Sequence, residues 1–156
     1  MYISQILFLC TGNYYRSRTA EELFNHLAIR EQLPWRADSM GLREDMSASK
    51  NVGPMSSLAI QFLEEREVPI VGIDRMPKSV GAGDFTAFER IICLDEAEHR
   101  PKMEERFPFW ANRVEYWDVP DLHVAPETYA LPRLHEHIVK LLEELTLEGF
   151  HDLVRR

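Results

Sequence analysis

The chain has few cysteines, few basic residues for its number of acidic ones, and no long hydrophobic run. Two cysteines, Cys10 and Cys93, are too few for a disulfide framework and suit a reducing compartment. Eighteen Lys and Arg against 26 Asp and Glu give a formal net charge of -8, which argues against a nucleic acid or an anionic membrane as partner. No apolar stretch reaches membrane-spanning length, and the N-terminus lacks the pattern of a secretory signal. We therefore expect a soluble, cytoplasmic protein.

Apolar runs alternate with amphipathic stretches along the whole chain, and there is no internal repeat or low-complexity tract. The pattern predicts strands at 3–9, 35–40, 90–94 and 114–119, and helices at 17–27, from Pro54 onward, at 98–107 and at 131–145. The segments 42–52 and 69–83 are expected to be a polar surface loop and an irregular stretch. This alternation predicts an α/β fold, a three-layer sandwich with a four-stranded, mainly parallel central sheet flanked by helices. A length of 156 residues suits one domain, residues 1–156.

One short segment combines a nucleophile with groups that bind an anion. It follows the first apolar run and precedes a helix-like stretch, and it reads Cys10-Thr11-Gly12-Asn13-Tyr14-Tyr15-Arg16-Ser17. A helix N-terminus offers free N–H groups and a positive dipole end, which favour a phosphate-sized oxyanion. The same field stabilises a thiolate, so we expect Cys10 to be ionised at neutral pH. Arg16 adds a planar fork of donors, and Gly12 and Asn13 are residue types that suit a loop needing positive φ.

A cysteine and an arginine six positions apart also occur by chance. In that interpretation Cys10 is a small buried hydrophobe that ends a core strand, and Arg16 is a surface residue. The context favours the phosphate site, because an apolar strand precedes the loop and a hydroxyl follows it at Ser17. Ligands of parallel α/β sheets bind at the carboxyl ends of the strands, which is where Cys10 is expected to lie.

Other segments match a known family in the same order. Residues 39–41 (Ser-Met-Gly) follow the second predicted strand, Asp-Phe at 84–85 precedes Ile-Ile-Cys-Leu-Asp at 91–95, and Val-Pro-Asp at 119–121 precedes the last helix. Together with the Cys-x-Gly-Asn-x-x-Arg-Ser loop, these segments resemble the low-molecular-weight protein tyrosine phosphatases over nearly the whole chain. The resemblance implies that family's fold, with its phosphate-binding loop after the first strand.

The resemblance also implies a role for each site residue. Cys10 would attack phosphorus and form a cysteinyl-phosphate, and the phosphate-binding residues would be Thr11, Gly12, Asn13, Tyr14, Tyr15, Arg16 and Ser17. Ser17 would also stabilise the thiolate, while Asn13 and Ser39 would support the loop. Asp121 would protonate the leaving oxygen and then activate water. No metal or other cofactor is expected, because Arg16 and the loop amides supply the positive field.

The sequence departs from the family pattern at several positions. Tyr15 stands where the family usually has a second cysteine, which predicts that oxidised Cys10 lacks a protective disulfide partner. Leu-His follows Asp121, where the family normally has Pro, so Asp118 remains a competing general acid. The ring of Tyr14 either lines the mouth of the site or packs against 42–52.

Further candidates remain open or are assigned to structure. His123 lies either near the mouth of the site or in solvent, and Arg75 either contacts substrate or pairs with an acidic neighbour. Cys93 is expected to be a buried strand residue. His135 and His137 point to different faces of a helix, which makes them a poor metal pair.

Three functions fit these observations. The first is a cysteine-dependent phosphatase, acting on a phosphotyrosine-containing protein or a small aryl phosphate, for which we expect a monomer. The second is a non-catalytic module that binds phosphate or a phosphorylated protein in the same loop. The third is an arsenate reductase, which needs further cysteines to resolve a thiol-arsenate adduct, whereas here only Cys93 is available.

Overall fold

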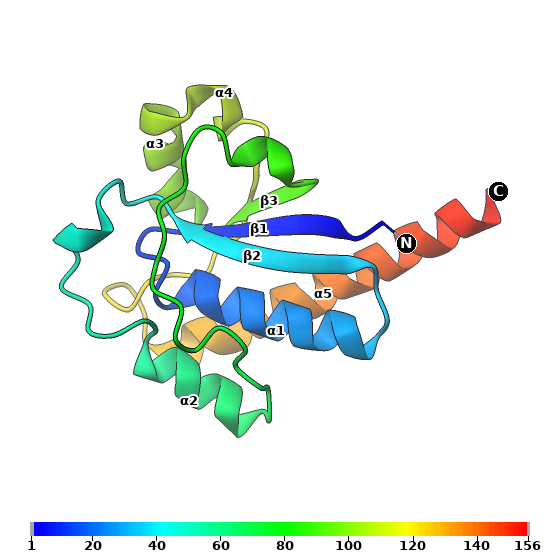
Figure 1. Cartoon of the computed structure of the whole chain (residues 1–156), viewed down its shortest axis with the longest axis horizontal. Coiled ribbons are helices and arrows are strands. Elements are labelled where there is room, and N and C mark those ends of the chain that lie inside the picture. The colour runs from blue at the N-terminus through cyan, green and yellow to red at the C-terminus, as the bar shows by residue number, and fades with distance from the viewer. Residues whose placement is uncertain (1, 156) are drawn as a thin grey trace.

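The computed structural model describes residues 2–155, and four parallel strands form its central sheet. In chain order the strands are β1 (Ser4–Cys10), β2 (Trp35–Gly41), β3 (Arg90–Cys93) and β4 (Glu115–Tyr116), and their order in the sheet is β2-β1-β3-β4 (Figure 1). Cys10 pairs in register with Gly41, and Leu9 pairs with Cys93. The three long strands therefore end close together at the edge of the sheet where Cys10 lies.

Helices cover both faces of the sheet. The helices α1 (Arg16–Arg30), α2 (Ser57–Glu65) and α5 (Glu127–Val154) lie on one face, and α3 (Glu96–Arg106) and α4 (Pro108–Ala111) lie on the other (Figure 1). Two single-turn helices, η1 (Met46–Ala48) and η2 (Phe85–Ala87), lie in the connections. This arrangement confirms the predicted three-layer α/β sandwich with a parallel sheet.

Strand β1 is apolar from Ile6 to Cys10 because both of its faces are buried there. Ile6 and Phe8 belong to the core cluster shared with α1, α2 and α5, whereas Leu7 and Leu9 belong to the cluster shared with α3 and α4. All four side chains are fully buried. Side chains alternate between the faces of a strand, so a central strand between two helical layers needs a continuous apolar run. Packing on both faces therefore fixes the strand, and with it the position of its last residue, Cys10.

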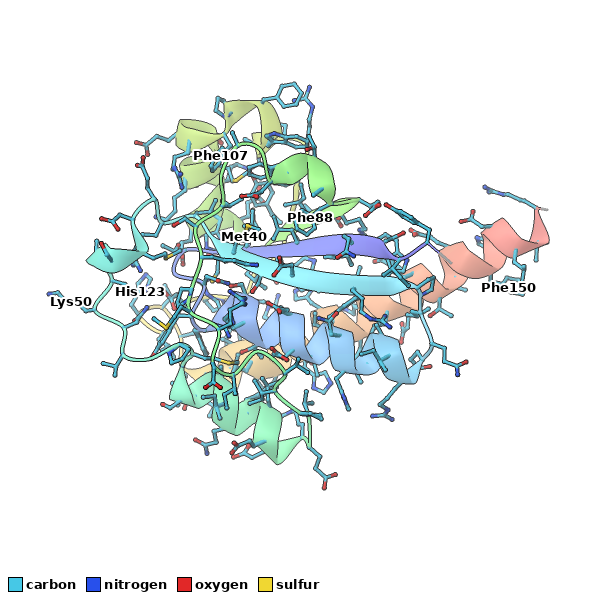
Figure 2. All side chains as sticks on the ribbon, in the orientation of Figure 1. Met40, Lys50, Phe88, Phe107, His123 and Phe150 are labelled. Carbon is cyan, nitrogen blue, oxygen red and sulfur yellow. The ribbon has the colours of Figure 1, made fainter. Side chains whose placement is uncertain are left out.

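Three predicted element boundaries differ from the structure. The strand predicted at 114–119 is only two residues long, because the chain leaves the ladder after Tyr116. Helix α2 begins at Ser57 rather than Pro54, since the hydroxyl of Ser56 accepts a hydrogen bond from the N–H of Leu58 and caps the helix. Helix α5 runs well beyond 131–145, and its end carries Phe150 away from the body of the molecule (Figure 2).

The same helix bears on the question of membrane insertion. Although α5 has 28 residues, it mixes charged with apolar positions along its length. No helix within residues 2–155 has both the length and the apolar character needed to cross a membrane.

Candidate active site

The loop between β1 and α1 takes its shape from Asn13. This residue has a φ of 49°, in the left-handed region that asparagine tolerates better than most residues. Its side-chain amide donates to the hydroxyls of Ser17 and Ser39, both at 2.9 Å. Its side-chain oxygen accepts from Arg75 Nη1 at 3.1 Å and from the backbone N–H of Lys78 at 3.0 Å. The buried amide is thus fully hydrogen-bonded, which holds the backbone in its unusual conformation.

Gly12 does not have the positive φ that the sequence suggested. Of the two loop residues, only Asn13 has positive φ. A Cβ atom at Gly12 would meet Arg43 Nη1 at 3.4 Å and Asn51 Nδ2 at 3.5 Å. Both distances are ordinary van der Waals contacts, so neither left-handed backbone nor close packing requires a glycine at this position.

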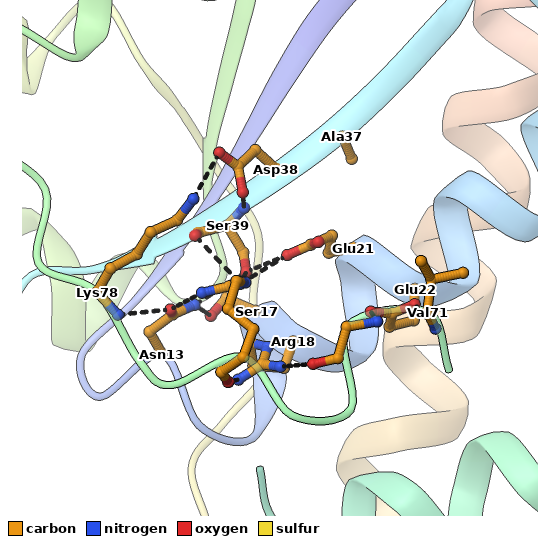
Figure 3. A network of polar contacts seen from close by, with 12 residues as sticks. Asn13, Ser17, Arg18, Glu21, Glu22, Ala37, Asp38, Ser39, Val71 and Lys78 are labelled. Carbon is orange, nitrogen blue, oxygen red and sulfur yellow. Dashed lines mark hydrogen bonds and ion pairs between the residues drawn. The ribbon is translucent and has the colours of Figure 1, made fainter. Parts of the chain in front are cut away.

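Ser39 lies beside Asn13 and Glu21 (Figure 3), and Arg75 joins these residues in a second layer of polar contacts that supports the loop. The Ser39 hydroxyl donates to Glu21 Oε1 at 2.6 Å and accepts from Asn13 and from Arg75 Nη2, the latter at 2.9 Å. Arg75 Nη2 also pairs with Glu21 at 2.9 Å. Of the two roles considered for Arg75 from the sequence, contact with substrate or pairing with an acidic neighbour, the structure shows the pairing. Strand β2, helix α1 and the segment 69–78 meet at this layer, so the loop rests on a rigid base.

Arg18 and Glu22, on the first two turns of α1, anchor the irregular segments to the body of the protein. Arg18 is fully buried and donates to the carbonyl oxygens of Pro54, Gly72 and Arg75 at 2.6–2.8 Å. Glu22 accepts from the N–H groups of Val71 and Gly72 at 2.9 and 3.0 Å. Burial lowers the pKa of Arg18, which the positive charge of Arg75 lowers further, and burial raises the pKa of Glu22. Sequence analysis missed both residues, since each acts on segments more than 30 positions away.

The Cys10 thiol lies 2.9 Å from the hydroxyl of Ser17. Asn13 already donates to this hydroxyl oxygen, so the Ser17 hydrogen is free to point at sulfur. A hydroxyl that donates to sulfur stabilises the thiolate relative to the thiol. The backbone N–H groups of residues 12–15 donate to no atom within residues 2–155 and are available to an incoming anion.

Arg16 is buried at the start of α1 and is held from the opposite side of the site. Its Nη1 donates to the carbonyl of Val119 at 2.9 Å, and its Nη2 donates to Glu98 Oε2 at 2.7 Å. Burial alone would lower the pKa of Arg16, but the negative charges of Cys10 and Glu98 outweigh it and raise the pKa. The guanidinium is therefore a permanent positive charge fixed over the loop.

A pocket of about 370 Å³ opens above the loop. Its lining residues come from the loop, the 42–56 segment, α3 and the turn before α5: Cys10, Thr11, Gly12, Tyr14, Tyr15, Arg16, Arg43, Asn51, Ser56, Glu98, Lys102, Asp121, Leu122 and His123. The Cys10 thiol, the Arg16 guanidinium and the carboxylates of Glu98 and Asp121 thus face one solvent-accessible space. Within residues 2–155, no three His, Cys, Asp or Glu side chains are grouped so as to hold a metal ion.

The structure separates the two aspartates that the sequence left in competition. Asp121 lines the pocket, and its Oδ2 lies 3.6 Å from Arg16 Nη2. Asp118 does not line it and is paired with Arg133 and with His137 Nε2, the latter at 2.7 Å. The hydrogen bond from Arg133, aided by the one from His137, lowers the pKa of Asp118 to about 2. Of these two aspartates, only Asp121 therefore faces a ligand in the pocket.

The residues at the mouth of the pocket also have defined positions. The Tyr14 hydroxyl donates to the carbonyl of Val52 at 2.6 Å while the residue lines the pocket, so both sequence interpretations of this side chain hold. His123 lines the pocket and is 72% exposed, at the end of the molecule where β1 and β2 terminate (Figure 2).

Tyr15 and Cys93 are buried instead. The Tyr15 hydroxyl has no hydrogen-bond partner among the described residues, and burial raises the pKa of this phenol. Both cysteines are free thiols, and Cys93 is fully buried in β3, where burial raises its pKa. A packed aromatic side chain thus occupies position 15, and Cys93 is the buried strand residue that the sequence predicted.

Glu98 is the site residue that sequence analysis missed. Its carboxylate contacts Arg16 and also accepts from the Thr11 hydroxyl at 2.5 Å. Residues 98–107 were predicted as a helix without a site role. The signal was available, because Glu98 lies in the first turn after the carboxyl end of a parallel strand, where ligand-binding residues of such sheets gather.

Comparison with known proteins agrees with this geometry. The family model described as low molecular weight phosphotyrosine protein phosphatase matches residues 5–155. The chain belongs to this family. Two curated members are the low molecular weight phosphotyrosine protein phosphatases of Gallus gallus, 27% identical over 63% of this chain, and of Homo sapiens, 28% identical over 61%. The aligned regions cover 59% and 57% of those two proteins, so the chain spans less than two thirds of their length.

A solved structure of another member extends the match. The low molecular weight protein tyrosine phosphatase from T. tengcongensis superposes with a TM-score of 0.73 and 25% identity, over 90% of this chain and 99% of that one. The family fold therefore extends over nearly all of the chain, including the loop, α3 and the turn that carries Asp121.

Proposed function

We propose that this protein is a cysteine-dependent phosphomonoester hydrolase that acts on phosphotyrosine in proteins or on small aryl phosphates. One observation carries the proposal: the Cys10 thiol, the Arg16 guanidinium and the Asp121 carboxylate line the same pocket, over a loop with free N–H groups. Membership of the phosphotyrosine phosphatase family supports it.

In the first step the Cys10 thiolate attacks phosphorus as the bond from phosphorus to the leaving oxygen breaks. Arg16 and the N–H groups of residues 12–15 stabilise the charge on the three equatorial oxygens. Asp121 enters this step protonated and gives its proton to the leaving phenolate oxygen. The products are a phenol, a cysteinyl-phosphate and an ionised Asp121.

In the second step water attacks the cysteinyl-phosphate. Asp121 takes a proton from the water as the new phosphorus–oxygen bond forms and the phosphorus–sulfur bond breaks. The Ser17 hydroxyl, 2.9 Å from sulfur, stabilises the departing thiolate. Inorganic phosphate leaves, Asp121 is protonated again, and the site returns to its starting state without a metal or cofactor.

The pocket supports an aryl ester as substrate. The Tyr14 ring lines its mouth and is tethered through Val52, which makes it a fixed surface for an aromatic leaving group. Arsenate reduction is disfavoured, because the only other cysteine, Cys93, is fully buried in β3. All the proposed site residues come from one chain, so a monomer suffices, and two free thiols suit the reducing cytoplasm.

The test is metal-free hydrolysis of p-nitrophenyl phosphate by the wild type, Cys10→Ser and Cys93→Ala. Cys93→Ala is the matched control, since it removes the other buried thiol. We expect turnover in the wild type and in Cys93→Ala, competitive inhibition by vanadate, and no turnover in Cys10→Ser. An inactive wild type that still binds phosphate in calorimetry would contradict the proposal and identify a binding module instead.

A further inference from the structure

One oxygen atom of Glu98 gathers contacts from three sides of the candidate active site. Its Oε2 accepts from Thr11 Oγ1 at 2.5 Å and from Arg16 Nη2 at 2.7 Å, and lies 3.0 Å from His99 Nε2. The side chain is only 16% exposed. The proposed mechanism assigns attack to Cys10 and proton transfer to Asp121, and it gives no role to the Glu98 carboxylate. The contacts of Glu98 therefore indicate a separate role.

The surroundings of Glu98 fix its charge. His99 is fully buried, and its Nδ1 accepts a hydrogen bond from the Asp95 N–H, which leaves the ring proton on Nε2, 3.0 Å from Glu98 Oε2 but not aligned as a hydrogen bond. Burial lowers the pKa of His99, so this ring is neutral. Burial would raise the pKa of Glu98, but the nearby His99 ring, together with the hydrogen bond and positive charge of Arg16, outweighs it and holds the pKa well below its usual range. Glu98 is therefore a carboxylate at neutral pH.

The contacts of Arg16 show what this carboxylate does. A guanidinium has five N–H donors in one plane. Val119 occupies a donor on Nη1 and Glu98 occupies one on Nη2, whereas Nε donates to no atom within residues 2–155. Two contacts at the terminal nitrogens fix both the position and the plane of the group. Nε and the remaining hydrogen of Nη2 make no hydrogen bond within residues 2–155, although Asp121 Oδ2 lies 3.6 Å from Nη2, so both can donate to an oxyanion.

The arrangement has an electrostatic disadvantage. A bound phosphate and the Glu98 carboxylate would both contact the same guanidinium, and like charges so close repel each other. Cys10, Asp121 and Asp95 add negative charge around the site, while Arg43 and Lys102, which also line the pocket, add positive charge. An acid at this position therefore weakens anion binding, which is tolerable only if it improves the geometry of Arg16.

We propose that Glu98 is a positioning residue for Arg16: it orients the guanidinium toward the phosphoryl group and lowers the affinity of the site for phosphate in exchange. The inference rests on the proposed function. It predicts that the charge of Glu98 and its hydrogen-bonding capacity have separable effects, the charge on anion affinity and the hydrogen bonds on turnover.

The experiment compares Glu98→Gln and Glu98→Ala with Glu96→Gln. Glu96 is an exposed neighbour on the same turn of α3 that pairs with Arg100, so its variant makes the same change in charge outside the site. Affinity for inorganic phosphate is measured by isothermal titration calorimetry at pH 7, and kcat and KM are measured with p-nitrophenyl phosphate. Thermal melts followed by circular dichroism check that each variant is folded.

For Glu98→Gln we expect phosphate to bind about tenfold more tightly, because one negative charge is removed. Its kcat should stay within about threefold of the wild type, since the amide oxygen still accepts from Arg16 and Thr11. For Glu98→Ala we expect kcat to fall on the order of 30- to 100-fold as the guanidinium loses its fixed orientation. Glu96→Gln should match the wild type in both measurements.

Unchanged phosphate affinity in Glu98→Gln would overturn the proposal, as would a kcat in a folded Glu98→Ala within about threefold of the wild type. If Glu98→Ala does not fold, Glu98→Gln alone decides, because a purely structural residue would not alter phosphate affinity. If the wild type has no turnover, the proposed function fails, and the comparison of phosphate affinities still decides whether Glu98 opposes anion binding.

Discussion

Asp121 and Asp118 lie three residues apart, yet replacing them should have different consequences. Asp121 lines the pocket beside Arg16, whereas Asp118 is paired with Arg133 and His137 and does not line it. The perturbation is the same for both, Asp to Asn, which keeps the shape and removes the acid. Any difference between Asp121→Asn and Asp118→Asn therefore reports on position rather than on residue type.

For Asp121→Asn the expected loss of kcat/KM depends on the leaving group, because kcat/KM reports the first step alone. General acid catalysis contributes about 10²- to 10⁴-fold, so we expect kcat/KM to fall on the order of 100-fold or more with phosphotyrosine. p-Nitrophenolate is a good leaving group that needs little protonation, so the fall in the first step should be much smaller with p-nitrophenyl phosphate. The larger loss with the poorer leaving group would identify Asp121 as the proton donor.

For Asp118→Asn we expect activity within about twofold of the wild type and a loss of stability instead. The fall of the Asp118 pKa from 3.8 to about 2 corresponds to roughly 2.4 kcal/mol if fully expressed. Because the side chain is 58% exposed, solvent screening should reduce this to ~1 kcal/mol or less. The pKa is depressed in the folded state, so this stabilisation is present above pH 3.8 and is lost as the pH falls toward about 2.

The assays are steady-state kinetics of both variants on the two substrates, and urea unfolding of the wild type and Asp118→Asn at pH 7 and pH 3. The difference in unfolding free energy between these two proteins should be smaller at pH 3. The reasoning is refuted if Asp118→Asn loses activity in the leaving-group-dependent way while Asp121→Asn keeps it.

Two further predictions concern the loop. In Gly41→Ala the new Cβ would lie 2.7 Å from the Thr11 carbonyl oxygen. We therefore expect the free energy of unfolding, measured with urea, to fall by ~1–3 kcal/mol, and kcat/KM to fall at least tenfold. The control Gly83→Ala, whose Cβ would have open space around it, should behave as the wild type in both assays. Peroxide should oxidise Cys10 to a sulfinic or sulfonic acid, detectable by mass spectrometry, because Tyr15 supplies no thiol to trap the sulfenic acid. Full recovery of activity with dithiothreitol would contradict this second prediction.

The sequence alone determined the layered fold and the position of the loop between β1 and α1, because both depend on residues that are close in the chain. The apolar run of β1 must be buried on both faces, and the loop from Cys10 to Ser17 is one continuous segment whose free N–H groups follow from the helix start at Arg16. Such features depend on local periodicity and local backbone geometry, which a single sequence displays. The sequence did not predict the short length of β4, because that length depends on where the chain separates from β3.

The remainder of the site was decided by tertiary structure. Arg16 binds Glu98, 82 positions away, and Val119, 103 positions away, and no local pattern indicates which acid or carbonyl meets that guanidinium. The choice between Asp118 and Asp121 likewise depends on Arg133, which holds one of them outside the pocket. These contacts form where separate strands and loops reach the same edge of the sheet, so they exist only once the sheet has brought those segments together.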